Sequence, residues 1–319
     1  MRQYIVRRLL LIIPIMLGVS FLTFATFHFL IAGNVVDILC GLTCDAETKL
    51  AIEHEYGLDR PWYEQYSDWL LDAAQGDFGT SYLTKLPLTT ELERRLPVTL
   101  ELMVLALVLS LVLGIPPGIL SAIRPATPLD WLARFSSVLW LSIPSFYLGI
   151  LVILFGANWF GWSPPNFATG KAVGFFDDPL TNLETFFFPS LVLALGTSAV
   201  IMRLTRSSML EVMRNDYIRT AWSKGLRERS VVGRHALKNA MIPVLTIIGL
   251  QVGGLIGGSV IIETVFGLNG MGSYLLVSII GRDILVVQSL VLMFAVIYVV
   301  INLLVDLGYA WLDPRIHYA

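Results

Sequence analysis

The feature that most constrains this chain is a series of apolar runs long enough to cross a membrane. Lipid offers no hydrogen-bond partner to a polypeptide backbone, so each run is predicted to be an α-helix of about 20 residues. Six runs occur in the 319 residues, at about 9–31, 98–123, 135–155, 187–203, 241–262 and 284–305. Charged residues make up only 14% of the chain, against about 25% in soluble domains. The sequence therefore predicts an all-α integral membrane protein with a single transmembrane domain over residues 1–319.

The first apolar run follows a basic start and has two interpretations. Arg2, Arg7 and Arg8 precede it, as they would in a secretory signal peptide. A signal peptide has an apolar core of about 7–15 residues, and the run at 9–31 is longer. We therefore expect a retained membrane span.

Two polar segments of opposite charge fix the expected orientation. Residues 32–97 contain twelve Asp and Glu against five Lys and Arg, whereas residues 203–238 contain nine Lys and Arg against three acids. Basic segments between spans stay on the cytoplasmic side. We therefore predict a cytoplasmic loop at 204–240, a large extracytoplasmic loop at 32–97 between the first two spans, and cytoplasmic N and C termini.

The outer loop is expected to hold some structure of its own. Helical pieces are predicted around Asp45–Tyr56 and Pro61–Ala74. Cys40 and Cys44 lie in the same loop, where a disulfide is chemically permitted, although two free thiols are an equal alternative. A metal site is not expected, because the nearest histidine, His54, lacks the spacing of a zinc site.

The basic loop contains a short amphipathic helix. Asn215 or Asp216 can act as its N-cap, and Gly225 is a natural left-handed stop. One face is expected to be apolar, with Tyr217, Ile218, Ala221 and Trp222. The opposite face is expected to be polar, with Arg219, Thr220, Ser223 and Lys224. A helix of about two turns is unstable alone, so it must dock on lipid headgroups or in a protein groove, and the pattern does not choose between them.

Glycines recur along the fifth run. Gly249, Gly253 and Gly257 are spaced by four residues, and Gly254 and Gly258 lie beside them. Such spacing favours close helix packing in membranes. These glycines are candidates for helix packing or for the pore.

Enzymatic and energy-coupling motifs are missing from the sequence. GxxxxGK[ST], HExxH and GxSxG do not occur. We therefore expect no enzyme, no catalytic residue and no metal or cofactor bound by this chain. Glu101 is the best candidate for an ion-coupling carboxylate, but it is more simply explained as a first-turn residue stabilised by the helix dipole. An ion-coupled secondary transporter stays an alternative.

Several long motifs in order resemble one family. RTAWSKGL at 219–226 and RHALKNAMIP at 234–243 are similar to the cytoplasmic signature loop of binding-protein-dependent ABC importer permeases. GLDRPWYEQYSDWL, LSIPSFYLG and GLQVGGLIGGSVIIETVFGLNGMG extend the resemblance over nearly all of the chain. More narrowly, the chain resembles the first permease subunit of dipeptide and oligopeptide importers. Arg219 stands where the general signature has Glu, a replacement usual in the peptide group.

The resemblance implies a type I ABC importer permease fold in a prokaryotic inner membrane. The short helix would be a coupling helix seated on a cytoplasmic ATPase, formed by Asp216, Tyr217, Arg219, Thr220, Ala221, Trp222, Lys224 and Gly225. The implied partners are a second homologous permease, two ABC ATPase domains that hold ATP and magnesium, an extracytoplasmic substrate-binding protein and membrane lipid. No nucleic acid is expected. Nickel complexes, glutathione or oligosaccharides are alternative substrates, because the same permease group serves them.

Overall fold

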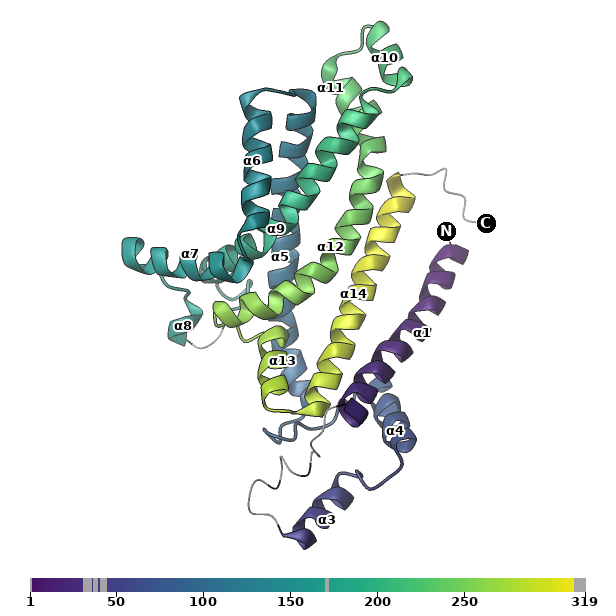
Figure 1. Ribbon diagram of the computed structural model, residues 1–319, viewed down its shortest axis with the longest axis vertical. Helices are drawn as coiled ribbons and strands as arrows, with labels where there is room; N and C mark the ends of the chain where they lie inside the picture. Colours follow the sequence, from purple (N-terminus) through teal and green to yellow (C-terminus); the bar gives the residue numbers. More distant parts are fainter. Residues whose placement is uncertain (1, 31–35, 37–39, 41–44, 170–171, 313–319) are drawn as a thin grey trace. The chain divides into compact units, whose positions relative to one another are not determined.

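The computed structural model describes residues 2–30, 36, 40, 45–169 and 172–312, and its regular structure there consists of helices (Figure 1). Among the described residues, five helices are long and apolar enough to cross a membrane, or six if one bent pair counts as a single span. The predicted all-α fold is confirmed.

The chain divides into two compact units, and the first comprises residues 1–98 and 270–299. Its helices are α1 (Arg2–Ala25), the π-helical η1 (Thr26–Leu30), α3 (Ala46–Glu55), α4 (Trp62–Ala74), α13 (Met271–Ile280) and the first parts of α5 (Leu88–Ile123) and α14 (Ile284–Leu312). The helical pieces predicted at Asp45–Tyr56 and Pro61–Ala74 are confirmed as α3 and α4. α3 begins where the Asp45 side chain accepts a hydrogen bond from the Thr48 backbone N–H, which would otherwise lack a helical partner.

A buried carboxylate organises the polar part of this unit. Asp283, 2% exposed, lies between α13 and α14 and accepts hydrogen bonds from the Ser81 hydroxyl and from the backbone N–H groups of Tyr82 (3.3 Å) and Leu83 (3.2 Å). Each bond satisfies a polar group that burial would otherwise penalise. The segment that leads into α5 is thereby fixed by a residue about two hundred positions away in sequence.

The second unit comprises residues 99–269 and 300–319. It contains the remainder of α5 and α14 together with α6 (Pro128–Ser142), α7 (Ser145–Phe160), α8 (Asn166–Thr169), α9 (Pro179–Val212), α10 (Asp216–Ser223), α11 (Glu228–Ser230), η3 (Val231–Ala236) and α12 (Leu237–Val265). α12 and α6 both pack on α9, which is the most buried of the long apolar helices (Figure 1). The loop expected at 204–240 is therefore mostly helical, because α9 extends to Val212 and the chain is helical again from Glu228.

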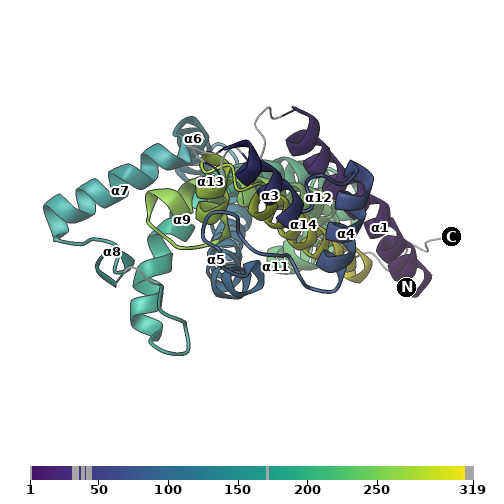
Figure 2. The same cartoon turned by 90° about the horizontal axis from the view of Figure 1, so that it is seen from below.

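The third predicted span is not one helix. α6 and α7 meet at an angle of 98° around Ile143 and Pro144, and Figure 2 shows α7 leading away from α6. Proline disfavours helical backbone at the residue before it, and Ile143 is extended, with φ −96° and ψ 121°. The span predicted over 135–155 therefore consists of two helices with a break at Ile143 and Pro144.

The fourth helix begins earlier than the expected 187–203. Asp178 caps α9 by accepting hydrogen bonds from the backbone N–H groups of Leu180 and Thr181, both at 3.2 Å, and Pro179 occupies the first turn. The Thr181 hydroxyl also donates a hydrogen bond to the Asp178 carboxylate. This bond contributes most, and the two backbone bonds add to it, in lowering the pKa of Asp178. Pro189 lies buried inside the helix.

Candidate functional site

The basic loop holds the predicted short helix. α10 runs from Asp216 to Ser223 after an N-cap at Asn215 in extended conformation. Gly225 follows with φ +72°, a left-handed conformation that costs an L-residue with a side chain about 1–2 kcal/mol. The expected N-cap and the glycine stop are both present.

One face of α10 is buried against its own chain. Ile218 and Ala221 are 0% and 5% exposed. They join an apolar cluster, here called the α10 cluster, with Ala122 from α5, Met209 from α9, Val231 and Ala236 from η3, and Ala240 from α12. Burial of apolar area supplies the tertiary stabilisation that a helix of two turns lacks alone. α10 therefore packs on other helices of its own chain, whereas the sequence analysis considered only lipid headgroups or a protein groove.

The remaining side chains of α10 form an outward surface. Tyr217 and Trp222, predicted on the buried face, are 41% and 42% exposed. Arg219, Thr220 and Lys224 are exposed as well, and Leu226 just beyond is 37% exposed. We call Tyr217, Arg219, Thr220, Trp222, Lys224 and Leu226 the α10 outer surface. Aromatic side chains and arginine, here Tyr217, Trp222 and Arg219, are enriched at protein interfaces.

Two polar contacts between side chains join the α10 outer surface to neighbouring described residues. Arg219 Nη1 lies 3.6 Å from Asp216 Oδ1, but both side chains are more than 70% exposed. Exposed ion pairs of this kind contribute little, about 0–1 kcal/mol. The Tyr217 hydroxyl accepts a hydrogen bond of 2.8 Å from Asn239 Nδ2. The charges of this surface are thus free to meet a partner.

A buried ion pair lies between two of the long helices, α6 and α9. Asp130 in α6 is 2% exposed by its side chain and accepts two hydrogen bonds from Arg206 in α9, from Nε at 2.8 Å and from Nη2 at 3.1 Å. Ser121 of α5 donates its hydroxyl to the same carboxylate and accepts a bond from Arg206 Nε at 2.8 Å. Bidentate pairs between arginine and carboxylate are strong and directional. Three helices that lead toward α10 are thereby tied together.

Sequence reasoning missed this network. Arg206 was counted only as one of the basic residues of the loop, and Asp130 was not singled out. The one local signal was Thr127-Pro128, which begins α6 and places Asp130 in its first turn. Nothing local pairs Asp130 with a residue 76 positions later.

The glycines of α12 divide into two kinds. A Cβ on Gly258 would lie 2.6 Å from Leu193 Cδ1, and one on Gly249 would lie 3.1 Å from Asn302 Oδ1, so these two glycines lie at helix contacts within the chain. Gly253, Gly254 and Gly257 are exposed. A Cβ on Gly254 or Gly257 would meet nothing within 4 Å. Only part of the predicted glycine face therefore packs inside this chain.

Among the described residues, the closest approaches of a glycine to the backbone of another helix occur in α5, where they were not predicted. A Cβ on Gly114 would lie 2.9 Å from the Ser198 carbonyl oxygen of α9, and one on Gly118 would lie 2.8 Å from the Met202 carbonyl oxygen. The missing side chains allow the two backbones to approach closely. The sequence did contain a signal for this packing, because Gly114 and Gly118 are four residues apart on either side of Pro116-Pro117.

The carboxylates near the apolar runs are placed differently from expectation. Glu101 is half-buried well inside α5, which begins at Leu88, so a first-turn helix-dipole explanation does not apply. Glu263 near the end of α12 is fully buried and accepts a hydrogen bond of 2.8 Å from the Thr99 hydroxyl. Cys44 lies outside the described residues, so the Cys40–Cys44 disulfide stays a prediction.

The fold and this loop together define a helical membrane protein of several spans. Its basic loop contains a short helix that turns one polar face away from the rest of the chain. Comparison with known proteins gives the family. The model of the "binding-protein-dependent transport system inner membrane component" matches residues 114–318, and that of its N-terminal region matches residues 1–103. The chain belongs to this family and is a multi-pass inner membrane component.

Relatives align over the whole chain. It is 39% identical over 334 residues to the dipeptide transport system permease protein DppB of Alkalihalophilus pseudofirmus, and 39% identical over 319 residues to the oligopeptide transport system permease protein AppB of Bacillus subtilis; both alignments cover 100% of each chain. It is 38% identical over 339 residues to DppB of Escherichia coli, with 100% of this chain and 99% of that protein covered.

Proposed function

We propose that this chain is a channel-forming subunit of an ATP-driven importer of dipeptides and oligopeptides. Full-length similarity to dipeptide and oligopeptide transport permeases supports this substrate class. In this proposal the chain pairs with a second permease subunit, receives substrate from an extracytoplasmic binding protein, and depends on two partner ATPase domains for hydrolysis.

The single observation that carries the coupling part of the proposal is the two-sided character of α10. Its inner face is sealed in the α10 cluster, so the helix moves together with the ends of α5, α9 and α12. Its outer surface presents Tyr217 and Trp222 beside basic side chains. A partner that pushes on this surface acts directly on the spans, without a flexible link between them.

The proposed orientation follows from charge. The 203–238 segment has a large excess of basic residues and the 32–97 segment a large excess of acids. Under the positive-inside rule α10 faces the cytoplasm, where ATPase domains lie, and α3 and α4 face outward. Both termini are then cytoplasmic, with the bent pair of α6 and α7 counted as one of six spans.

The test uses the complete complex in lipid nanodiscs with its binding protein and two variants of the α10 outer surface, Trp222→Ala and Lys224→Glu. Truncation of an aromatic residue at the centre of an interface costs about 2 kcal/mol or more. We expect the ATPases to co-purify at least about tenfold less well with Trp222→Ala, and peptide-stimulated ATP hydrolysis to fall with both variants. The melting temperature of the permease should stay unchanged, because both side chains are exposed.

Glu64→Gln on α4 is a matched control, since Glu64 is equally exposed but lies far along the chain from α10. It should leave hydrolysis unchanged. Full co-purification and full stimulation with both α10 variants would refute the coupling surface. Stimulation of the wild-type complex by a nickel complex, glutathione or an oligosaccharide, and by no peptide, would keep the architecture and overturn the substrate.

A further inference from the structure

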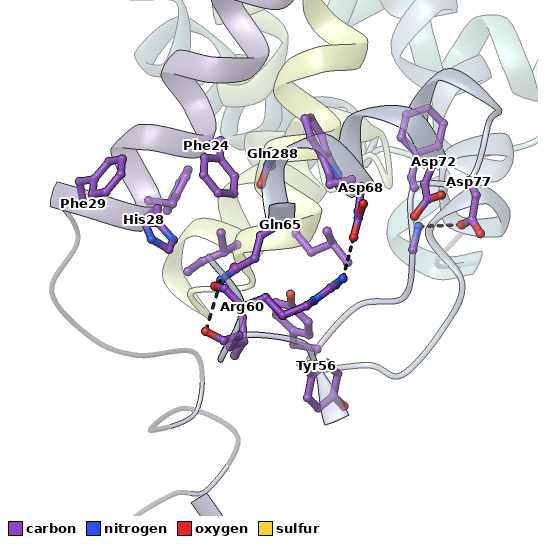
Figure 3. Close-up of a pocket in the computed structure, with 18 residues that line it drawn as sticks. Phe24, His28, Phe29, Tyr56, Arg60, Gln65, Asp68, Asp72, Asp77 and Gln288 are labelled. Atoms are coloured by element: carbon purple, nitrogen blue, oxygen red, sulfur yellow. Dashed lines mark hydrogen bonds and ion pairs between the residues drawn. The ribbon is translucent and has the colours of Figure 1, made fainter. Parts of the chain in front are cut away.

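The first unit contains a cavity of about 540 Å³, which is within the usual range of about 300–1,000 Å³ for small-molecule sites. Its walls come from the end of α1 and η1, from α4, from the segment at 77–82, and from the start of α14 (Figure 3). All of these parts belong to the same compact unit. We call it the α4 cavity.

The α4 cavity carries an excess of negative charge. Three carboxylates line it, from Asp68, Asp72 and Asp77, against one guanidinium, from Arg60. Arg60 Nη1 donates to Asp68 Oδ2 at 2.7 Å, and Asp77 Oδ1 accepts the backbone N–H of Gly79 at 2.9 Å (Figure 3). This arrangement favours a cationic group, and the exposed Asp72 carboxylate forms no ion pair with any described residue.

Two buried donors in the lining, one from α4 and one from α14, have no hydrogen-bond partner among the described residues. Trp69 is 9% exposed and Gln288 is 4% exposed, and Trp69 Nε1 and Gln288 Nε2 form no hydrogen bond with any described residue. Both residues line the α4 cavity. A buried donor without an acceptor costs about 1–3 kcal/mol, so native proteins rarely keep one without a reason. A ligand that brings acceptor oxygens would satisfy both donors once the two side chains turn toward the cavity.

The rest of the lining is largely aromatic. Phe24 stacks on His28 with ring centroids 5.2 Å apart, and both line the cavity together with Phe29 and Tyr56 (Figure 3). Aromatic walls accept apolar groups of varied shape, and their faces also attract cations. The cavity thus combines anionic groups, N–H donors and an apolar wall.

We propose that the α4 cavity binds the amino-terminal end of a short peptide, with the protonated α-amino group at the carboxylates of Asp68, Asp72 and Asp77 and a peptide carbonyl at the N–H groups of Trp69 and Gln288. The aromatic wall takes the first side chains with little selectivity. This inference rests on the proposed peptide substrate and adds to it a subsite on the permease itself, separate from the binding protein.

The test measures equilibrium binding of labelled dialanine to the full complex in nanodiscs, without binding protein and without ATP. N-acetyl-dialanine, which lacks the ammonium group, is the matched ligand. We expect saturable binding of dialanine that is at least about tenfold weaker for the acetylated peptide, which loses its charge toward all three carboxylates. Asp72→Asn should weaken binding about threefold, because the Asp72 carboxylate is exposed. Trp69→Phe, which removes the indole N–H together with the pyrrole part of the ring, should weaken binding about fivefold. Its melting temperature is measured alongside, because the smaller ring also loses packing at a residue that is 9% exposed.

Glu64→Gln should bind dialanine as the wild type does, because Glu64 lies on α4 outside the cavity lining. Equal affinity for free and acetylated dialanine, or unchanged affinity in both variants, would overturn the inference, and so would the absence of saturable binding. Uptake of dialanine by the wild-type complex with its binding protein is measured separately. Normal uptake without binding at the α4 cavity would overturn the inference and leave the proposed function standing.

Discussion

The buried pair of Asp130 and Arg206 gives the sharpest quantitative prediction. Arg206 makes two charge-assisted hydrogen bonds to a carboxylate that is only 2% exposed, at 2.8 and 3.1 Å. Removing one partner of such a pair leaves a buried charge uncompensated, which costs about 3–5 kcal/mol. Arg206 is itself 25% exposed, so water can partly solvate it when Asp130 is neutral. We therefore expect Asp130→Asn to cost less, about 2–3 kcal/mol, and Arg206→Met to cost about 3–5 kcal/mol.

The double variant separates the pair from its surroundings. Because each single variant already loses the interaction, the double variant should cost less than the sum of the two, with a coupling energy of about 1.5–3 kcal/mol. The assay is denaturant unfolding of the purified chain in mixed micelles, followed by circular dichroism. ATPase coupling in the full complex is measured on the same four proteins and should fall in the single variants, because α5, α6 and α9 lose their common tie.

Ser207→Ala is the matched control. Ser207 neighbours Arg206 in α9, but its side chain is exposed and bonds only to the Leu204 carbonyl of its own helix. It should change the free energy of unfolding by less than about 0.5 kcal/mol. A coupling energy below about 0.5 kcal/mol between Asp130 and Arg206 would show that the two sites act independently, and the reasoning above would be refuted.

Three further predictions concern other sites. Gly118→Ala should lower the free energy of unfolding by about 1–3 kcal/mol in a denaturant titration, because its Cβ would meet the Met202 carbonyl oxygen at 2.8 Å. Gly254→Ala, whose Cβ would meet nothing within 4 Å, should leave the free energy of unfolding nearly unchanged. Equal effects of the two variants would contradict the packing of α5 on α9. Ala221→Asp should destabilise the loop itself, since it would place a charge in the α10 cluster, and faster limited proteolysis after residue 212 without any ATPase present would reveal this. Burial, followed by the nearby Asp283 carboxylate, raises the pKa of Tyr82 to about 12. In the unfolded chain the Tyr82 hydroxyl loses its proton near pH 10. The free energy of unfolding should therefore fall as the pH rises from about 10 to about 12, and it should fall less steeply in Tyr82→Phe.

Local patterns in the sequence were sufficient for most of the helices. Apolar runs of span length must be helical in lipid, and the short helix is bounded by Asn215 and Gly225, whose backbone preferences act within a few residues. α3 and α4 follow from caps and composition in the same way. These features depend on neighbours in sequence, so they can be deduced without knowledge of the fold.

The effect of each proline on its helix could not be predicted from the local sequence. Pro116 and Pro117 lie within α5 and Pro243 lies within α12, yet Pro144 separates α6 from α7 with a bend of 98°. Loss of one hydrogen bond permits a break but does not require it. Which outcome occurs depends on what packs against the helix, and a single sequence does not contain that information.

The arrangement of the candidate site was decided by tertiary contacts. The apolar stripe of α10 was wide enough to include Tyr217 and Trp222, and only the positions of Met209, Val231 and Ala240 determine that Ile218 and Ala221 face inward. The same is true of Asp130 with Arg206, 76 residues apart, and of Ser81 with Asp283, 202 residues apart. Periodicity and capping operate over a few residues, so the sequence by itself determined which segments are helical and which side of the membrane each is expected to face. The side that each polar group turns toward its partner was determined only by the folded chain, because that choice rests on contacts between segments far apart in sequence.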